Sequence, residues 1–163
     1  MLPARGRVAV TVSSIALLAL VLGACAGPDE TGTMAQRVSA WASSTGFTGE
    51  IGTISADIDR VARVAAHGSP GAIRADCAVL SSDTAEAHQN LPTPDQGLTE
   101  TLVRAYGEAS NAAEDCYAGA GGAPGDMARF SAEREAFFRS SIQAQAEVDT
   151  LEHGGAVSGS GGS

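Results

Sequence analysis

Apolar residues recur at every third or fourth position along four stretches of the chain. Side chains with this spacing share one face of an α-helix, so the pattern predicts helices over about residues 50–67, 70–90, 95–118 and 126–151. The four apolar stripes are, in order, Ile51, Ile54, Ile58, Val61 and Ala65; Ile73, Cys77, Leu80, Thr84, Ala87 and Leu91; Leu98, Leu102, Ala105, Ala109, Ala112 and Cys116; and Met127, Phe130, Phe137, Ala144, Val148 and Leu151, the last interrupted at Arg134 and Ser141. No stretch shows the period-two alternation of a half-buried strand.

A shorter stripe of Met34, Val38 and Trp41 allows one further short helix before Gly46. The connections between the main helices are short, which makes neighbouring helices antiparallel. The predicted fold is therefore all-α: a small antiparallel helical bundle of about four helices over residues 34–152. Its helix seams are rich in alanine, so each contact buries little area and the core would gain from a covalent cross-link.

Residues that start and stop helices support these bounds. Ser69-Pro70 and Thr93-Pro94 each place a capping hydroxyl before a proline suited to the first helical position. Gln96 would complete a capping box with Thr93. His67-Gly68 is typical of a helix end, and the glycines of residues 119–125 predict a loop.

The N-terminal segment follows a different pattern. Arg5 and Arg7 precede an apolar run of 15 residues, 8–22, which is short for a spanning helix but typical of a secretory signal. The run ends in Leu22-Gly23-Ala24-Cys25, which resembles the bacterial lipobox. The resemblance implies that residues 1–24 are a lipoprotein signal peptide and that Cys25 is lipidated. It also implies that the lipid holds the protein to the membrane on its extracytoplasmic side. An ordinary cleaved signal and an uncleaved anchor are the alternatives.

Composition also changes at the flanks of the predicted domain. Residues 25–33 are small and polar, as in a tether, and residues 153–163 are rich in Gly and Ser, which predicts a disordered tail. The chain has 10 basic and 19 acidic residues, a net charge of −9; without residues 1–24, which hold two arginines and no acid, the balance is 8 to 19, or −11. This acidic balance argues against nucleic acid as a partner. It also means that lipid, and not protein charge, would hold the domain to an anionic membrane.

The three cysteines are expected to have two different roles. If Cys25 carries lipid, Cys77 and Cys116 remain, both on apolar stripes of adjacent predicted helices. An oxidising, extracytoplasmic setting favours a disulfide between them. Closing a loop of 39 residues would stabilise the fold by about 4 kcal/mol. Two free buried thiols are the alternative.

This disulfide conflicts with an ideal helical hairpin. A hairpin that turns at residues 92–93 would place Cys77 opposite residue 108, about 12 Å along the helix from Cys116. A disulfide needs its Cα atoms within about 7 Å. We therefore expect the second helix to end before Ala87 and residues 87–93 to run extended.

No spacing typical of a catalytic or metal site is found in the sequence. His67, His88 and His153 belong to no HExxH or Glu-x-x-His motif, and structural roles are expected for all three. Asp57-Ile58-Asp59 lacks the glycine and the later Glu of a calcium loop and is expected on a solvated helix face. No serine stands in a G-x-S-x-G motif. We predict no catalytic residue, no metal and no cofactor.

The segment Cys77…Leu91-Pro92-Thr93-Pro94-Asp95…Cys116, together with the lipobox and the absence of lysine, resembles a loose group of actinobacterial lipoproteins. In that group a helical domain carries two cysteines around a Pro-x-Pro-Asp turn. The resemblance covers about residues 70–120 and the signal. It implies the fold and the anchor, and no particular activity.

These features favour a non-enzymatic lipoprotein that binds an envelope protein or another envelope component. The alternative is a carrier of a small molecule or lipid, with an apolar groove between helices around Phe130, Phe137 and Phe138. Only 4% of the residues are aromatic, so the same rings are also needed to fill the core.

Overall fold

The computed structural model describes residues 31–122 and 126–154, which form helices and no strand. The helices are α1 (Met34–Thr45), α2 (Phe47–His67), α3 (Pro70–His88), α4 (Gln96–Gly119) and α5 (Asp126–His153). The all-α prediction is confirmed. The predicted number of about four is corrected to five, because the short stripe before Gly46 forms a separate helix.

Several predicted features lie outside the described residues. These are the signal peptide, the lipobox of Leu22, Gly23 and Ala24, the lipidated Cys25, the tether before residue 31 and the tail after residue 154. Among the helices that are described, none has the length and hydropathy needed to cross a bilayer.

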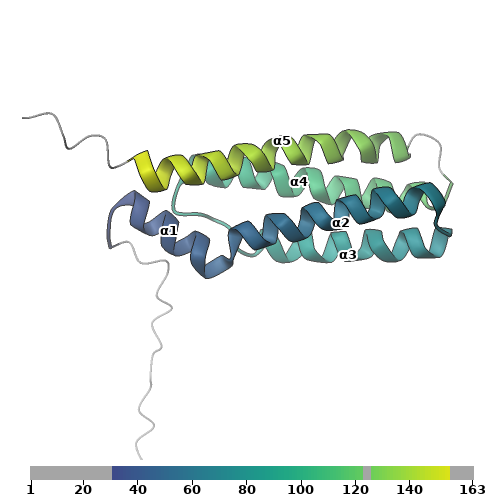
Figure 1. Cartoon of the computed structure of the whole chain (residues 1–163), viewed down its shortest axis with the longest axis horizontal. Helices are drawn as coiled ribbons and strands as arrows, with labels where there is room; N and C mark the ends of the chain where they lie inside the picture. Colours follow the sequence, from purple (N-terminus) through teal and green to yellow (C-terminus); the bar gives the residue numbers. More distant parts are fainter. Residues whose placement is uncertain (1–30, 123–125, 155–163) are drawn as a thin grey trace, which may run out of the picture.

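The five helices form four antiparallel arms (Figure 1). α1 and α2 share the first arm, which bends at Gly46. This glycine has φ of +67°, a left-handed conformation that is unfavourable for residues with a Cβ. Its N–H donates a hydrogen bond to the carbonyl of Ala42. α3, α4 and α5 then run back and forth along the length of the bundle.

The predicted apolar stripes face the core. Fully buried members come from every helix and include Val38, Ile54, Leu80, Leu102 and Phe137. Ser141 is buried too, and its hydroxyl donates a hydrogen bond to the Phe138 carbonyl at 3.1 Å, so the buried face continues through this position. Together these residues form one continuous core along the bundle.

The predicted start of α3 and end of α2 are confirmed. The Ser69 hydroxyl accepts a hydrogen bond from the Ala72 N–H at 3.3 Å, and Pro70 occupies the first turn of α3. α2 ends at His67, and the N–H of Gly68 bonds the carbonyl of Val64. The chain therefore turns from α2 into α3 across two residues.

The helix predicted over about residues 95–118 is observed as α4, but its predicted cap, Thr93, is wrong. The cap is Asp95, whose carboxylate accepts a hydrogen bond from the Leu98 N–H at 2.9 Å. The Thr93 hydroxyl accepts from the Asp95 N–H at 3.2 Å and so holds the turn before the helix. Gln96 is the first helical residue and forms no capping box with Thr93. Asp95 is as good a cap as Thr93 by residue type, and the later position is the one adopted.

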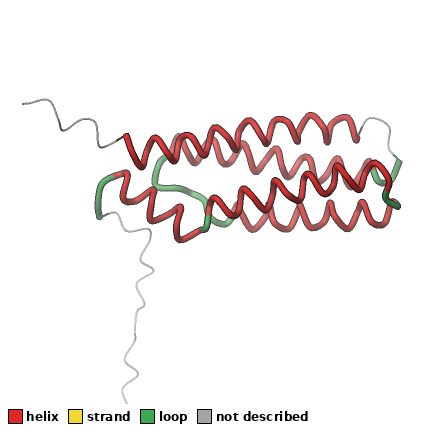
Figure 2. Tube along the Cα trace, viewed as in Figure 1, coloured by secondary structure: helices red, strands yellow, loops and turns green. Residues whose placement is uncertain are grey.

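The predicted disulfide between Cys77 and Cys116 is confirmed, with its Cα atoms 5.9 Å apart. The predicted path of the chain between the two cysteines is wrong. Helix α3 does not end before Ala87 but continues to His88, and Ala87 is a buried residue of this helix. From residue 77 to the end of α3 is about 16 Å, whereas from residue 116 back to the start of α4 is about 30 Å. The connector of residues 89–95 covers the difference by running on past the end of α3 (Figure 2).

Candidate functional site: an acidic pocket between α2 and α3

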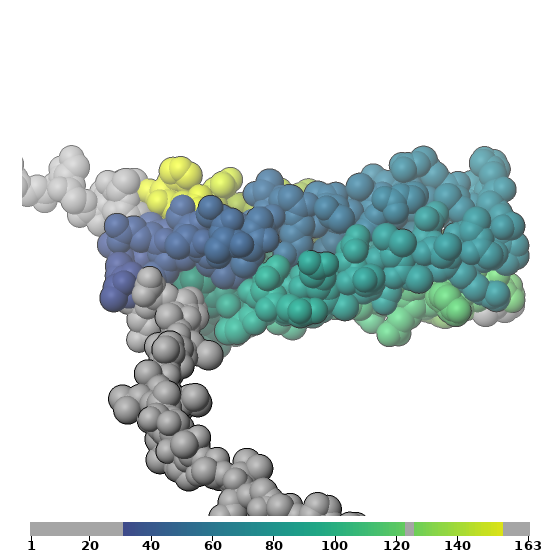
Figure 3. Space-filling view, turned by 90° about the horizontal axis from the view of Figure 1, so that it is seen from below, coloured from purple at the N-terminus to yellow at the C-terminus, as the bar shows by residue number. Residues whose placement is uncertain are grey.

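A pocket of about 270 Å³ opens between α2 and α3, close to the bend at Gly46. Figure 3 shows the face on which these two helices lie side by side. The lining residues are Thr45, Gly46, Glu50, Thr53, Ile54, Asp83, Glu86, Ala87 and Asn90. Three of these side chains are carboxylic acids and none is basic, so the pocket favours a cationic group.

Helical periodicity gathers these side chains at one place. Glu50, Thr53 and Asp57 follow one another at steps of three and four along α2, and Asp83, Glu86 and Asn90 do the same along α3 and just past its end. Such residues share a face of their helix. Because α2 and α3 are antiparallel neighbours, the two acidic faces meet at the same groove.

Glu50 is held in place by hydrogen bonds to both carboxylate oxygens. The Tyr106 hydroxyl of α4 donates to Oε1 at 2.5 Å, and the Asn90 side-chain amide donates to Oε2 at 2.5 Å. Hydrogen bonds to a charged acceptor contribute about 1.5–3 kcal/mol each. The carboxylate at the pocket wall therefore has a fixed position.

Tyr106 acts as a permanent donor in this arrangement. Its ring is fully buried and packs edge-on against the His88 ring, with 5.4 Å between centroids. Burial, reinforced by the hydrogen bond to Glu50, raises the pKa of Tyr106 far above its usual range. The hydroxyl thus keeps its proton and continues to donate to Glu50 at any physiological pH.

The same network reaches α1. The Trp41 indole N–H donates to the backbone carbonyl of Asn90 at 2.9 Å, and the Trp41 ring lies 5.4 Å from the Phe47 ring. Trp41, Asn90, Glu50 and Tyr106 thereby connect α1, the connector, α2 and α4. The shape of the pocket wall is set by the packing of the whole bundle.

Asp57 is a buried acid one turn beyond Thr53. Its side chain is 2% exposed, and its Oδ1 pairs with the Arg60 guanidinium at 2.6 Å. Oδ2 has no hydrogen-bond partner within residues 31–122 and 126–154, and Asp83 of α3, which lines the pocket, is near enough to act on the pKa of this carboxyl. Burial, together with Asp83, raises the pKa of Asp57 to about 6 despite Arg60.

The prediction of a solvated face for Asp57-Ile58-Asp59 is therefore wrong in part. Asp59 is half-exposed and pairs with Arg134 of α5 at 2.9 Å, as a surface acid can. Asp57 instead lies in the register of the buried stripe, three residues after Ile54 and four before Val61. That register was the signal in the sequence that could have identified it.

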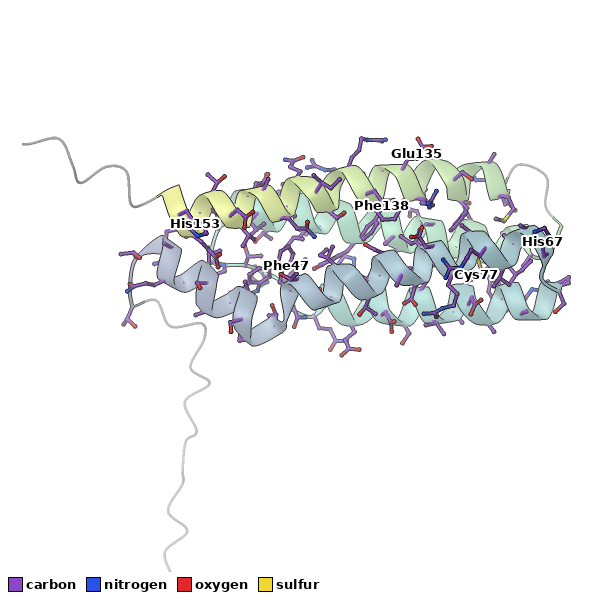
Figure 4. All side chains as sticks on the ribbon, in the orientation of Figure 1. Phe47, His67, Cys77, Glu135, Phe138 and His153 are labelled. Atoms are coloured by element: carbon purple, nitrogen blue, oxygen red, sulfur yellow. A yellow bond between two sulfur atoms is a disulfide. The ribbon has the colours of Figure 1, made fainter. Side chains whose placement is uncertain are left out.

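The aromatic groove of the carrier alternative is not found around the predicted rings. Phe130 and Phe137 are 2% and 0% exposed, and Phe138 packs edge-on against Phe137 with centroids 5.6 Å apart. Figure 4 places Phe138 between α5 and α2, where the Arg134 guanidinium lies over its ring. These rings fill the core, as the low aromatic content requires.

The three histidines lie apart from one another. His67 is exposed at the end of α2, His153 is exposed at the end of α5, and His88 packs on Tyr106 (Figure 4). Within residues 31–122 and 126–154, no three His, Cys, Asp or Glu side chains are arranged to hold a metal ion.

A second concave surface lies between α3 and α4, over the disulfide. It has a volume of about 420 Å³ and is lined by Cys77, Ala78, Ser81, Ala113, Glu114, Tyr117 and Ala118. Tyr117 is 55% exposed, and the Arg74 guanidinium lies over its ring. This surface is mainly apolar, and Glu114 is its one acidic lining residue.

No protein family, curated protein or solved structure matches the chain.

Proposed function

We propose that the chain is a lipid-anchored, extracytoplasmic binding module, without catalytic activity, that holds a basic side chain of an envelope protein in the α2–α3 pocket. The observation that carries this proposal is the fixed Glu50 carboxylate in a pocket with two further acids and no basic lining residue. A carboxylate with a fixed position offers a guanidinium two parallel hydrogen bonds without first losing side-chain entropy.

The size of the pocket supports one side chain as the occupant. Pockets for drug-sized ligands have volumes of about 300–1,000 Å³, and this one has about 270 Å³. A single arginine or lysine side chain suits that space, whereas a lipid tail would need a longer and less polar cavity. Arginine suits it best, because its planar fork matches a carboxylate and sheds water more readily than an ammonium group does.

Glycines beside the pocket support a protein partner. Gly49 and Gly52 stand inside α2 next to Glu50 and Thr53, and a Cβ at either would meet nothing within 4 Å. A helical glycine costs about 1 kcal/mol relative to alanine, and nothing in the described residues requires one at these positions. Because glycine has no side chain, the surface of α2 is flat at these two positions, and the backbone of a partner could approach it closely.

The lipidated Cys25 would keep the site near the membrane. The eight residues from there to Thr33, the cap of α1, span at most about 28 Å when extended. α1 begins at the end of the bundle opposite to the disulfide (Figure 4). The bundle would therefore stand with its disulfide end away from the lipid and its α2–α3 face open to other envelope proteins.

An NMR titration with two matched peptides tests this function. The purified full chain in detergent micelles is titrated with a capped Gly-Arg-Gly peptide and with the same peptide carrying citrulline, which has the shape of arginine without its charge. We expect the arginine peptide to shift the signals of Glu50, Thr53, Glu86 and Asn90, and the citrulline peptide to leave them unchanged. Equal shifts from both peptides, or none from either, would contradict the proposal.

A further inference from the structure

The outer face of α3 carries almost no charge. Among the residues of this helix that are exposed between Pro70 and Ala85, only Arg74 is charged. The other exposed residues are small or apolar and include Ala75, Ala78, Val79, Ser82 and Ala85. A helix at the surface of a soluble bundle has charged and polar residues opposite its core stripe, and a helix that lacks them is usually covered. The outer face of α3 therefore has the composition of a contact surface.

The neighbouring side of α4 continues this surface. Val103, Ser110 and Tyr117 follow one another at steps of seven, so they share one stripe of α4, and Tyr117 lines the concave surface between α3 and α4. Val79, Val103 and Tyr117 are exposed, and among the described residues only one other large apolar side chain is exposed, Ile142 of α5. We call the uncharged outer residues of α3, together with this stripe of α4, the α3–α4 face. The disulfide beneath it joins the two helices, so a partner meets a preformed surface.

Two charged side chains lie on the α3–α4 face, and neither has an opposite charge in its own chain. The Arg74 guanidinium of α3 lies over the Tyr117 ring, 5.7 Å from its centroid, and Glu114 of α4 lines the concave surface. Within residues 31–122 and 126–154, neither Arg74 nor Glu114 takes part in an ion pair. This pattern favours a partner that offers an apolar surface with the opposite charges at matching positions.

We propose that the α3–α4 face binds a second copy of this chain, in a parallel dimer whose two-fold axis runs along the bundle. Such an axis places α3 of each copy opposite α4 of the other, so Arg74 faces Glu114 and Tyr117 of the second copy. With an axis across the bundle, α3 would face α3 and α4 would face α4, so Arg74 and Glu114 would not meet. The charges therefore select the parallel arrangement.

The heights of the two charges along the bundle fit this arrangement. The disulfide holds Cys77 level with Cys116, with their Cα atoms 5.9 Å apart. Arg74 comes three residues before Cys77 and Glu114 two residues before Cys116, in helices that run in opposite directions. Their offset is about 7.5 Å along the helix axes, which these two long side chains can span.

The area of the α3–α4 face suits a weak dimer. The 19 residues of α3 are about 28 Å long and two adjacent helices are about 20 Å wide, so the face covers about 570 Å² of each copy. The dimer would bury about 1,100 Å² in all, slightly more than the roughly 1,000 Å² of a specific interface. A parallel dimer also has both N-termini at one end, which is compatible with the proposed lipid anchor, although the inference does not rest on that anchor.

The mass of the protein in excess detergent micelles tests the dimer. Size-exclusion chromatography with light scattering, absorbance and refractive index gives the mass of the full chain without its detergent. We expect one chain at low protein concentration and two at high concentration. Ser81→Glu places an unpaired carboxylate in the α3–α4 face and should weaken the dimer at least about tenfold, whereas Ile142→Glu adds the same charge on α5 and should have no effect. A monomer at every concentration would leave the face to another envelope component and overturn the proposal, as would a dimer that Ser81→Glu leaves intact.

A charge exchange tests the two-fold axis. Arg74→Glu and Glu114→Arg should each weaken the dimer about fivefold, because like charges then meet across the axis, and the double variant should restore wild-type association. Both residues are exposed, and circular dichroism checks that each variant keeps its helices. A double variant as weak as either single variant would overturn this axis.

The same samples separate the dimer from the proposed function. None of the substituted residues lines the α2–α3 pocket. A monomer that binds the capped Gly-Arg-Gly peptide would overturn the dimer alone. A dimer that does not bind this peptide would support the dimer and contradict the proposed function alone.

Discussion

Reduction of the Cys77–Cys116 disulfide should remove a large part of the stability of the bundle. The bond closes a loop of 39 residues in sequence separation and clamps α3 to α4 at the end of the bundle away from their connector. For a loop of this size, the entropy that the cross-link removes from the unfolded chain corresponds to about 4 kcal/mol. Typical domains have a total stability of about 5–15 kcal/mol, so the reduced protein is expected to be marginally stable.

Urea unfolding followed by circular dichroism, with and without reductant, measures this effect. With a denaturant slope of about 1.5 kcal/mol per M, a loss of about 4 kcal/mol lowers the midpoint by about 2.5 M. The double variant Cys77→Ala, Cys116→Ala should lose slightly more, because two buried sulfur atoms are also removed from the core. A drop of less than about 1 kcal/mol on reduction would refute the reasoning and would show that the α3–α4 contact persists in the unfolded chain.

Three other sets of substitutions test the network, the glycines and the anchor. Tyr106→Phe should cost about 1.5–3 kcal/mol in urea unfolding, because Glu50 loses a charge-assisted hydrogen bond, whereas Tyr117→Phe at an exposed site should cost little; equal costs would contradict the account. Gly52→Ala should stabilise the chain by about 0.5–1 kcal/mol, because a Cβ there meets open space, whereas at Gly68 it would lie 2.5 Å from a Val64 methyl group and destabilise; the reverse order would be inconsistent with this packing. Cys25→Ser should release the protein from membranes into the soluble fraction, and mass spectrometry of the native protein should find a lipid on Cys25; membrane retention of the variant would rule out the anchor.

The helices and most of their ends could be predicted from sequence because the signals are local. The apolar stripes follow from helical periodicity, and the end of α2 and the start of α3 from Gly68 and Ser69. The connector could not be predicted, because Thr93 and Asp95 are comparable caps within two residues of each other. The choice between them depends on the path that the connector takes in the assembled bundle.

The candidate site was harder to predict than the fold. Glu50, Asp83 and Glu86 each look like ordinary exposed acids in the sequence, and only the pairing of α2 with α3 brings them together. Asp57 carried a local signal, its place in the buried stripe, yet the charge made a solvated face the more natural interpretation. The donor that fixes Glu50 comes from Tyr106, 56 residues away in the chain. Such contacts arise from tertiary packing and leave no motif in a single sequence.

The most direct test of the central claim compares the affinity of wild type, Glu50→Gln and Glu135→Gln for the capped Gly-Arg-Gly peptide at pH 7. Glu135 is exposed on α5 and points away from the pocket (Figure 4), so its substitution removes the same charge at a remote site. The account predicts that Glu50→Gln weakens binding by about tenfold, equivalent to about 1.4 kcal/mol, and that Glu135→Gln binds like wild type. Equal affinities in all three proteins, or equal losses in both variants, would contradict recognition of a basic group by the α2–α3 pocket.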